Sequence, residues 1–129
     1  MIKMDIITLL GAIVLAYGGM LLLYYQLRKN ERRKKMSNLF LNGTKSMRRG
    51  NLDKALIYFD RAYEYSIETN NREEMADALY NMGIIYKEKG EMDNAMEYLN
   101  SAQNTYDELM NNEGSEKAML ATRSIRWSW

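Results

Sequence analysis

The sequence predicts an all-α protein, with a single N-terminal transmembrane helix followed by a short array of helical hairpins. Three observations lead to this fold class. Residues Ile6 to Leu27 carry no charge. The rest of the chain has apolar residues at spacings of three and four, between short turn-like segments. Two stretches, 39–62 and 79–102, match each other in the order of their small and large residues.

The uncharged stretch is long enough to cross a membrane. As a helix its 22 residues span about 33 Å, against about 30 Å for the hydrocarbon core of a bilayer. A cleaved signal peptide would have a shorter apolar core followed by small residues, where this chain has the bulky run Leu21–Tyr25. A helix of a soluble core would seldom lack charge over six turns. We therefore expect residues 1–27 to be a transmembrane anchor.

The juxtamembrane segment 28–35 sets the expected orientation of this anchor. Basic residues favour the cytoplasmic side of a membrane helix, and the other flank offers only Lys3 and the terminal amine. We therefore expect a single-pass protein of the cell membrane with a cytoplasmic C-terminal domain. The segment would also attract anionic lipid, or it only sets the topology. It holds Glu31 and six basic residues: Arg28, Lys29, Arg32, Arg33, Lys34 and Lys35.

Within the expected membrane helix, small residues share one side. Ala12, Ala16 and Gly19 are spaced by four and three residues, and small residues let two membrane helices approach closely. We interpret them as a helix–helix contact face. The alternative is that membrane helices are rich in Gly and Ala in any case.

Composition excludes several classes of function. Residues 36–129 have a net charge of −4 and residues 1–35 a net charge of +5, and an acidic domain disfavours nucleic acid. The chain has no Cys and no His, which removes thiolate chemistry, the usual zinc ligands and the commonest general base. The paired acids Glu73-Glu74 and Asp107-Glu108 are expected at a solvated surface. We expect no enzyme activity, no cofactor and no metal site.

After the anchor, the chain is expected to be helical throughout. The turn-like breaks are Gly50-Asn51, 69–71, Gly90-Glu91 and 111–114, and Asn51 and Ser115 are the expected N-caps. These breaks separate five helices: 37–49, 52–68, 73–89, 92–110 and 115–127.

These helices repeat with a period of about 40 residues, within the range that marks a repeat array. Gly43 corresponds to Gly83, and Gly50 to Gly90. One set of small and large residues recurs in order: Leu39, Gly43, Gly50, Ala55, Phe59 and Ala62, then Leu79, Gly83, Gly90, Ala95, Leu99 and Ala102.

This order resembles the tetratricopeptide repeat family, in a variety with a longer period than the usual one of about 34 residues. The resemblance implies repeats at about 36–71 and 76–111 and a capping helix at 115–127. Gly43 and Ala55 would lie where the two helices of a repeat cross, and Gly50 would adopt a left-handed conformation that ends the first helix. A third copy would need glycine at 123, where the chain has Arg123.

In this family, the first helices of successive repeats line a groove that holds a peptide or a partner's helix. Phe40 and Tyr80 are either part of this surface or ordinary core residues. A carboxylate clamp is not expected, because only Asn81 fits it while Phe40 and Thr44 replace its Lys and Asn. By resemblance, the groove residues would be Phe40, Thr44, Met47, Arg48, Asp77, Tyr80, Asn81, Ile84 and Lys87.

We therefore expect a membrane-anchored adaptor that recruits or stabilises a partner protein. The alternatives are an accessory subunit of a membrane complex, recognised through its transmembrane helix, and an assembly factor or chaperone for membrane clients. Two repeats and one cap should leave apolar surface beyond Met119 and Ile125, covered by a partner or by a second copy in a homo-oligomer. Trp127 and Trp129 would cap this end or dock a partner.

Overall fold

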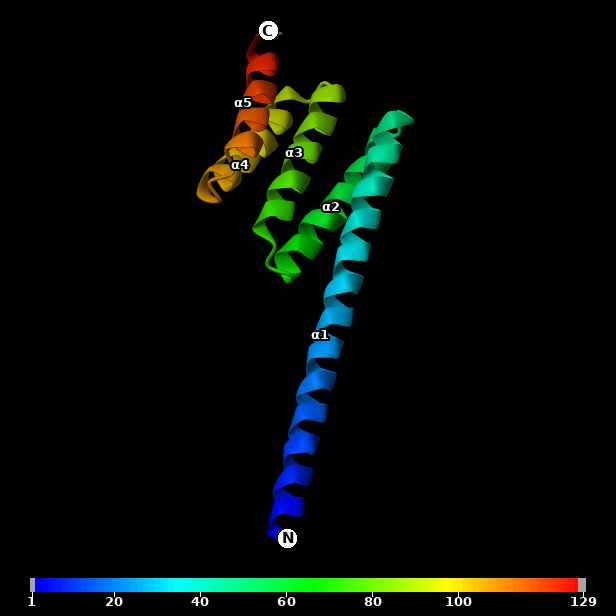
Figure 1. The fold of residues 1–129 in the computed structure, drawn as a ribbon. Helices are drawn as coiled ribbons and strands as arrows, with labels where there is room; N and C mark the ends of the chain where they lie inside the picture. The colour runs from blue at the N-terminus through cyan, green and yellow to red at the C-terminus, as the bar shows by residue number, and fades with distance from the viewer. Residues whose placement is uncertain (1, 128–129) are drawn as a thin grey trace. The chain divides into compact units, whose positions relative to one another are not determined.

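The computed structural model describes the backbone of residues 2–127 and the side chains of residues 5–126. The chain divides into two compact units, Met1–Lys35 and Met36–Trp129, which are described separately below. The described part is helical, as the sequence predicts. Its helices are α1 (Ile2–Arg48), α2 (Leu52–Glu68), α3 (Arg72–Glu88), α4 (Met92–Glu108) and α5 (Asn112–Trp127) (Figure 1).

The first unit is helical and exposes its apolar side chains. Ile7 is 70% exposed and Leu15 is 78% exposed, and none of the most apolar part of this helix is buried. By length and composition this helix could cross a membrane, although a signal sequence would meet the same criteria. The prediction that a separate helix starts at residue 37 was wrong, because α1 continues to Arg48. Residues 28–36 contain neither Gly nor Pro, so nothing in them interrupts a helix.

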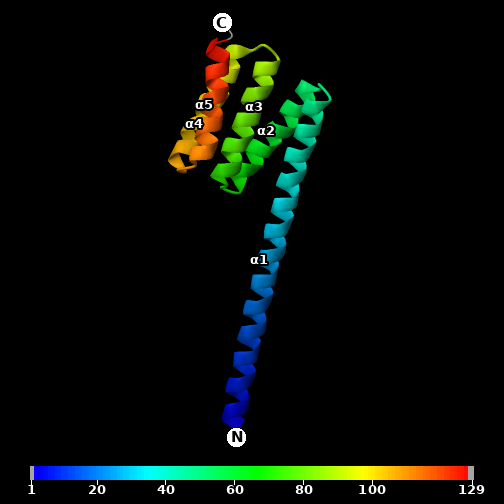
Figure 2. The same cartoon turned by 45° about the horizontal axis from the view of Figure 1, so that its top comes forward.

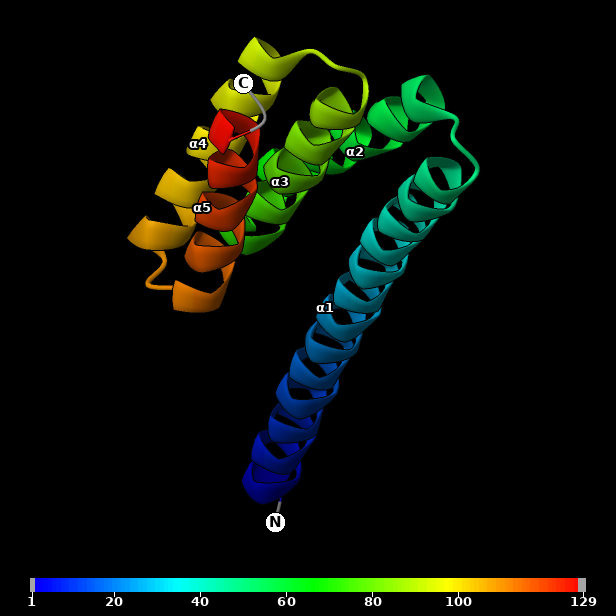
Figure 3. The same ribbon diagram turned by 90° about the horizontal axis from the view of Figure 1, so that it is seen from above.

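The second unit is a series of helical hairpins. Consecutive helices are joined by short turns (Figure 2), and α3 and α5 lie in front of α2 and α4 (Figure 3). Two layers result, one holding the first helices of the hairpins and the other holding the second helices. This layering leaves one side of α3 and α5 free of the second helices.

Four turns of one design connect the helices, at regular intervals along the chain. Their left-handed residues are Gly50, Asn70, Gly90 and Met110, with φ of 77°, 53°, 81° and 56°. Each donates its N–H to the carbonyl three residues earlier, and the following residue donates to the carbonyl five residues earlier. This pattern satisfies the last carbonyls of a helix and stops it. The predicted left-handed conformation of Gly50 is confirmed.

Asparagine caps begin three of the helices. The side chain of Asn51 accepts from the N–H of Lys54 at 3.2 Å, and Asn71 does the same for α3. Asn111 accepts from the N–H of Gly114 at 3.0 Å. The predicted cap at Ser115 was therefore wrong, and α5 starts at residue 112 rather than 115.

Two further predicted boundaries were off by one or two residues. The helix expected at 73–89 spans 72–88, and the helix expected at 92–110 ends at 108. The second error has a clear cause, because Met110 is the left-handed residue of its turn despite having a side chain. No glycine stands there to mark the end of α4.

Close packing inside each repeat depends on a glycine. A Cβ on Gly43 would lie 2.7 Å from the ring of Phe59, and one on Gly83 would lie 2.7 Å from Leu99. The predicted pairing of Gly43 with Ala55 was therefore incomplete, because the tightest contact of Gly43 is with Phe59, one turn further along α2. Ala55 is itself fully buried beside Phe59. Each glycine thus makes room for one bulky side chain of the second helix.

Polar residues at the outer sides of the array replace residues that are apolar or buried inside it. In α3, the inner helix, Ala78, Met82 and Ile85 are buried. The residues forty positions earlier, in α1, are Asn38, Asn42 and Lys45, all exposed. At the other end, exposed Arg123 and Arg126 stand forty positions after Gly83 and Tyr86.

The predicted apolar end beyond Met119 and Ile125 was wrong at Ile125, which is 1% exposed and packs with Ala95 and Leu99. Helical arrays close their ends with polar outer faces of this kind. Trp129 and the side chain of Trp127 lie outside the described residues, so their predicted contacts stay predictions.

Candidate partner-binding face

The predicted groove residues of α1 are only partly available to a partner. Phe40 is half-buried, and its ring meets Phe59 edge-on with centroids 5.6 Å apart. Met47 packs against the same core cluster. Thr44 is half-buried, and Arg48 at the end of the helix is exposed. On this helix the aromatic residue therefore serves mainly the core, and Thr44 and Arg48 present the polar surface.

The predicted residues of α3 lie along one side of that helix and are all half-buried. Their spacing of three and four residues brings them into one strip, the first-helix face. Tyr106 of α4 donates its hydroxyl to the Asp77 carboxylate, and the amide of Asn81 donates to the Asp77 carbonyl at 2.8 Å. The strip comprises Asp77, Tyr80, Asn81, Ile84 and Lys87.

Helix α5 extends the first-helix face, which the sequence reasoning missed. The ammonium of Lys117 lies 4.3 Å from the centre of the Tyr80 ring. The ammonium of Lys87 donates to the hydroxyl of Ser124 at 2.6 Å. Leu120, one turn after Lys117, is 54% exposed. The 40-residue repeat could have predicted these residues. Lys117, Leu120 and Ser124 stand 40 positions after Asp77, Tyr80 and Ile84.

The titratable groups of this face include two phenols and two ammonium groups. Burial raises the pKa of Tyr106, and its hydrogen bond to Asp77 adds to the effect. Burial also raises the pKa of Tyr80. Both phenols therefore stay protonated at neutral pH. Neither Lys87 nor Lys117 forms an ion pair with a carboxylate in the described part of the chain.

The face has no arrangement that points to catalysis. Its polar groups are an amide, two ammonium groups, the hydroxyls of Tyr80 and Ser124, and a carboxylate held by a phenol, beside the apolar Ile84 and Leu120. Among the described residues, no group of three His, Cys, Asp or Glu side chains could hold a metal ion. Such a mixture of apolar and hydrogen-bonding groups suits recognition of a protein surface.

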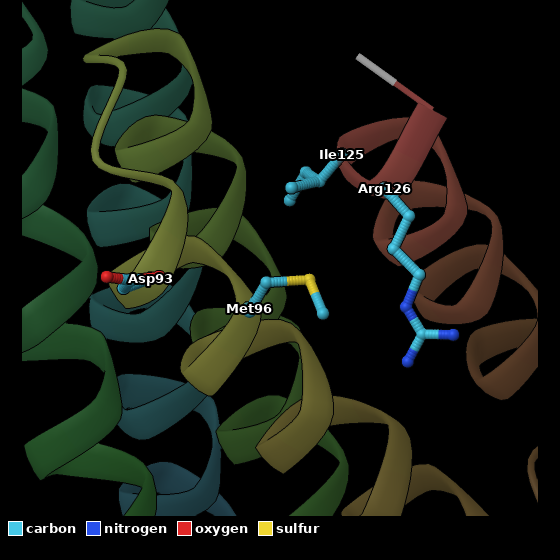
Figure 4. Close-up of a pocket in the computed structure, with 4 residues that line it drawn as sticks. All are labelled: Asp93, Met96, Ile125 and Arg126. Carbon is cyan, nitrogen blue, oxygen red and sulfur yellow. The ribbon is translucent and has the colours of Figure 1, made fainter. Parts of the chain in front are cut away.

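A cavity of about 380 Å³ lies away from this face, between the start of α4 and the end of α5 (Figure 4). Asp93 and Met96 line it from α4, and Ile125 and Arg126 line it from α5. In Figure 4 the Met96 side chain points toward α5, while the guanidinium of Arg126 extends away from Ile125. None of the predicted groove residues contributes to this cavity.

The predicted membrane contact residues occupy exposed positions of α1. Ala12, Ala16 and Gly19 are all exposed. A Cβ built on Gly19 would have no atom within 4 Å. These positions are therefore accessible to a second membrane helix, and their role in such a contact stays a prediction.

Comparison with known proteins found one family match and similarity to a solved structure. A family model described as tetratricopeptide repeat matches residues 44–108, about half of the chain. The chain is also similar to the solution NMR structure of designed protein DA05, with 28% sequence identity and a TM-score of 0.57. That similarity covers 60% of this chain and 77% of the designed one. Among curated proteins, none matches this chain.

Proposed function

Because this chain belongs to the tetratricopeptide repeat family, we propose that it is a membrane-anchored adaptor that recruits or stabilises a partner protein at the cytoplasmic face. Repeats of this family generally serve protein–protein interaction and are non-catalytic scaffolds. We assign residues 1–27 to the anchor, 28–35 to a juxtamembrane segment and 36–129 to the repeats. A 40-residue period is part of this proposal, supported by the starts of α2 and α4 at Leu52 and Met92.

One observation carries the proposal: a fully exposed apolar helix precedes a repeat domain that has a mixed polar and apolar face. Water-exposed leucine and isoleucine along six turns would be unfavourable in solution, by roughly 25 cal/mol for each Å² of apolar surface. A bilayer removes that cost. The basic segment that follows favours a cytoplasmic repeat domain.

We further propose that the partner contacts the first-helix face. Asn81 and Lys87 supply directed hydrogen bonds, and Ile84 lies one turn from each on the same side of α3. Thr44 and Arg48 extend the surface onto α1, and Leu120 extends it onto α5. Phe40, Met47 and Tyr80 are expected to support the surface from the core side, because they pack against buried clusters. Asp77 is expected to hold this part of α3 in place through its hydrogen bond with Tyr106 of α4.

The test is affinity purification from nonionic detergent, comparing the full chain with Asn81→Arg. A bulky cation at this half-buried position should displace a partner from the face and reduce recovery at least fivefold. Asn104→Arg is the matched control, since Asn104 is exposed on α4, in the other layer. Equal recovery with both variants would rule out the first-helix face as the partner's binding site.

An accessory subunit recognised through its membrane helix is the second candidate. The exposed Ala12, Ala16 and Gly19 favour it. In this case residues 36–129 alone would recover nothing, and Ala16→Leu in the full chain would release the partner while Asn81→Arg would not. The adaptor predicts the reverse pattern, in which the soluble repeats still recover the partner.

The proposed topology has its own test. The chain has no native cysteine, so Ser101→Cys, at an exposed position of α4, introduces a unique thiol. An impermeant thiol reagent should label it only after lysis. Labelling in intact cells would place the repeats outside and reverse the assignment.

A further inference from the structure

The cavity between α4 and α5 has the size and lining for a large aromatic side chain. It measures about 380 Å³ and is lined by Asp93, Met96, Ile125 and Arg126 (Figure 4). A cavity of about 150 Å³ already holds a benzene ring, so this one has room for an indole. Met96 and Ile125 supply apolar surface, while Asp93 and Arg126 are exposed. An apolar wall with a polar edge suits tryptophan, whose ring is apolar and whose N–H needs an acceptor.

Helical spacing along α5 brings residue 129 to the side of the helix that carries Ile125. Ile125 is buried there and packs with Ala95 and Leu99 of α4. Trp129 follows Ile125 by four residues, the spacing that places two side chains on one side of a helix. Helical side chains also lean toward the N-terminus of their helix. On a continued helix, a tryptophan at 129 would therefore lean back over Ile125, which lines the cavity.

The preceding pair of helices shows which residue this position reaches. Lys89 stands forty positions before Trp129, and its ammonium donates to the carboxylate of Asp53 at 2.7 Å. Asp53 in turn stands forty positions before Asp93. The equivalent pair is therefore Trp129 and Asp93, and Asp93 forms no ion pair in the described part of the chain. Tryptophan keeps a hydrogen-bond donor, its indole N–H, and adds an apolar ring.

The other tryptophan has a different register. Trp127 stands forty positions after Lys87, a residue of the first-helix face. It also follows Ser124 by three residues, which places it on the same side of α5 as Ser124. Of the two tryptophans, only Trp129 continues the spacing of the buried side of α5.

We propose that the indole of Trp129 occupies this cavity in its own chain, with its ring against Met96 and Ile125 and its N–H directed at Asp93. The cavity is then closed by a residue that follows its own lining. The inference goes beyond the proposed function, because it depends on neither the membrane anchor nor the first-helix face. It assigns Trp129 to closing the array and leaves the first-helix face as the surface for a partner.

The first measurement is tryptophan fluorescence of the full chain in nonionic detergent. The chain has two tryptophans, so Trp127→Phe leaves Trp129 as the single indole. A ring inside the cavity should be quenched by acrylamide at least threefold less than N-acetyltryptophanamide in the same micelles. Quenching equal to that of the free amide would place Trp129 in solvent, where it is available to a partner, and would overturn the inference.

The second measurement locates the ring, since detergent could also shield it. The chain has no native cysteine, so Asp93→Cys can carry a bimane fluorophore, which tryptophan quenches at contact distance. In the Trp127→Phe chain, we expect this bimane emission to rise at least twofold when Trp129→Phe is added. Asp53→Cys is the matched control, because both aspartates are exposed and lie in the first turns of α2 and α4. Bimane emission in the control should not change.

Two results would contradict this placement of Trp129. If loss of Trp129 leaves the bimane emission of Asp93→Cys unchanged, the ring lies elsewhere even where acrylamide does not reach it. If the quenching disappears when the chain is diluted at constant detergent concentration, the ring comes from a second copy of the chain. Both cysteine variants replace exposed side chains, and circular dichroism checks that each keeps its helical content.

Discussion

The two repeats bury the same positions with different side chains. In α2 and α4 the pattern of buried, half-buried and exposed residues is identical from Leu52 to Ser66 and from Met92 to Tyr106. Yet Ser66 in the first repeat corresponds to Tyr106 in the second, and both are completely buried. The backbone arrangement is therefore constant, while the distribution of volume is not.

The following helix compensates for this difference in volume. A Cβ on Gly114 of α5 would lie 2.4 Å from the Tyr106 ring, so the large phenol requires a residue without a side chain there. At the equivalent place in the first repeat, Ser66 is small and its hydroxyl donates to the Tyr63 carbonyl at 2.6 Å, while α3 carries Glu74. The second repeat therefore offsets a larger side chain in α4 with a glycine in α5, as close packing requires.

The largest difference between the repeats is expected from removing these two buried residues. Tyr106→Ala should destabilise residues 36–129 by about 3–5 kcal/mol, because it leaves a cavity beside Gly114. Ser66→Ala, at the equivalent position, should cost about 1 kcal/mol or less through one lost hydrogen bond. Urea unfolding followed by circular dichroism measures both. Similar losses would show that the two positions are energetically equivalent after all.

A smaller loss is expected when only the hydroxyl is removed. Tyr106→Phe should cost about 1.5–3 kcal/mol at pH 7, the range for a hydrogen bond to a charged group such as Asp77. The pKa of Tyr106 is raised in the folded state. Its contribution is therefore fully present below the unfolded pKa of about 10 and is lost as pH rises further.

The dependence of stability on pH in the alkaline range provides the matching control for this variant. Between pH 9 and 12, Tyr106→Phe should lose stability less steeply than the native chain. It should not become flat, because Tyr80 and Tyr98 also have raised pKa values. Parallel curves for both proteins would contradict the assigned role of Tyr106.

Adding one methyl group tests the feature that the two repeats share. Gly83→Ala places a Cβ 2.7 Å from Leu99 and 3.3 Å from its backbone nitrogen. Overpacking costs about 1–3 kcal/mol, offset by up to about 1 kcal/mol of helix propensity, so a net loss on the order of 1 kcal/mol is expected. Gly43→Ala should behave alike against Phe59. Melting temperatures test both variants, and an unchanged value would count against this repeat register.

The smallest expected effect concerns the turns. Met110 has φ of 56° at the place where the first repeat has Asn70, and where the turns inside each repeat have Gly50 and Gly90. Met110→Gly should stabilise the domain by about 0.5–1 kcal/mol, because relief of the left-handed strain exceeds the added entropy of the unfolded chain. Gly90→Ala should destabilise it by a similar amount. If Met110→Gly is less stable than the native chain, the Met110 side chain makes a stabilising contact although it is 86% exposed.

Local patterns in the sequence were enough to predict several helix boundaries and the repeat register of this protein. The uncharged stretch from Ile6 to Leu27, the cap at Asn51 and the left-handed turn at Gly50 each depend on residues a few positions apart. The repeat register depends on glycine and alanine positions that recur from one repeat to the next. Local propensity and periodicity record such features directly, and the family match agrees with them.

Other features were decided only by contacts between helices. The start of α5 at residue 112 was missed because Gly114 looked like a turn residue, whereas it makes room for Tyr106 of α4. Phe40 was ambiguous until its ring was found against Phe59, and Lys117 joined the first-helix face only through Tyr80. The physical reason is the same in each case. Whether a side chain is core or surface depends on the volume and polarity of a neighbour far away in the chain, which local pattern does not encode.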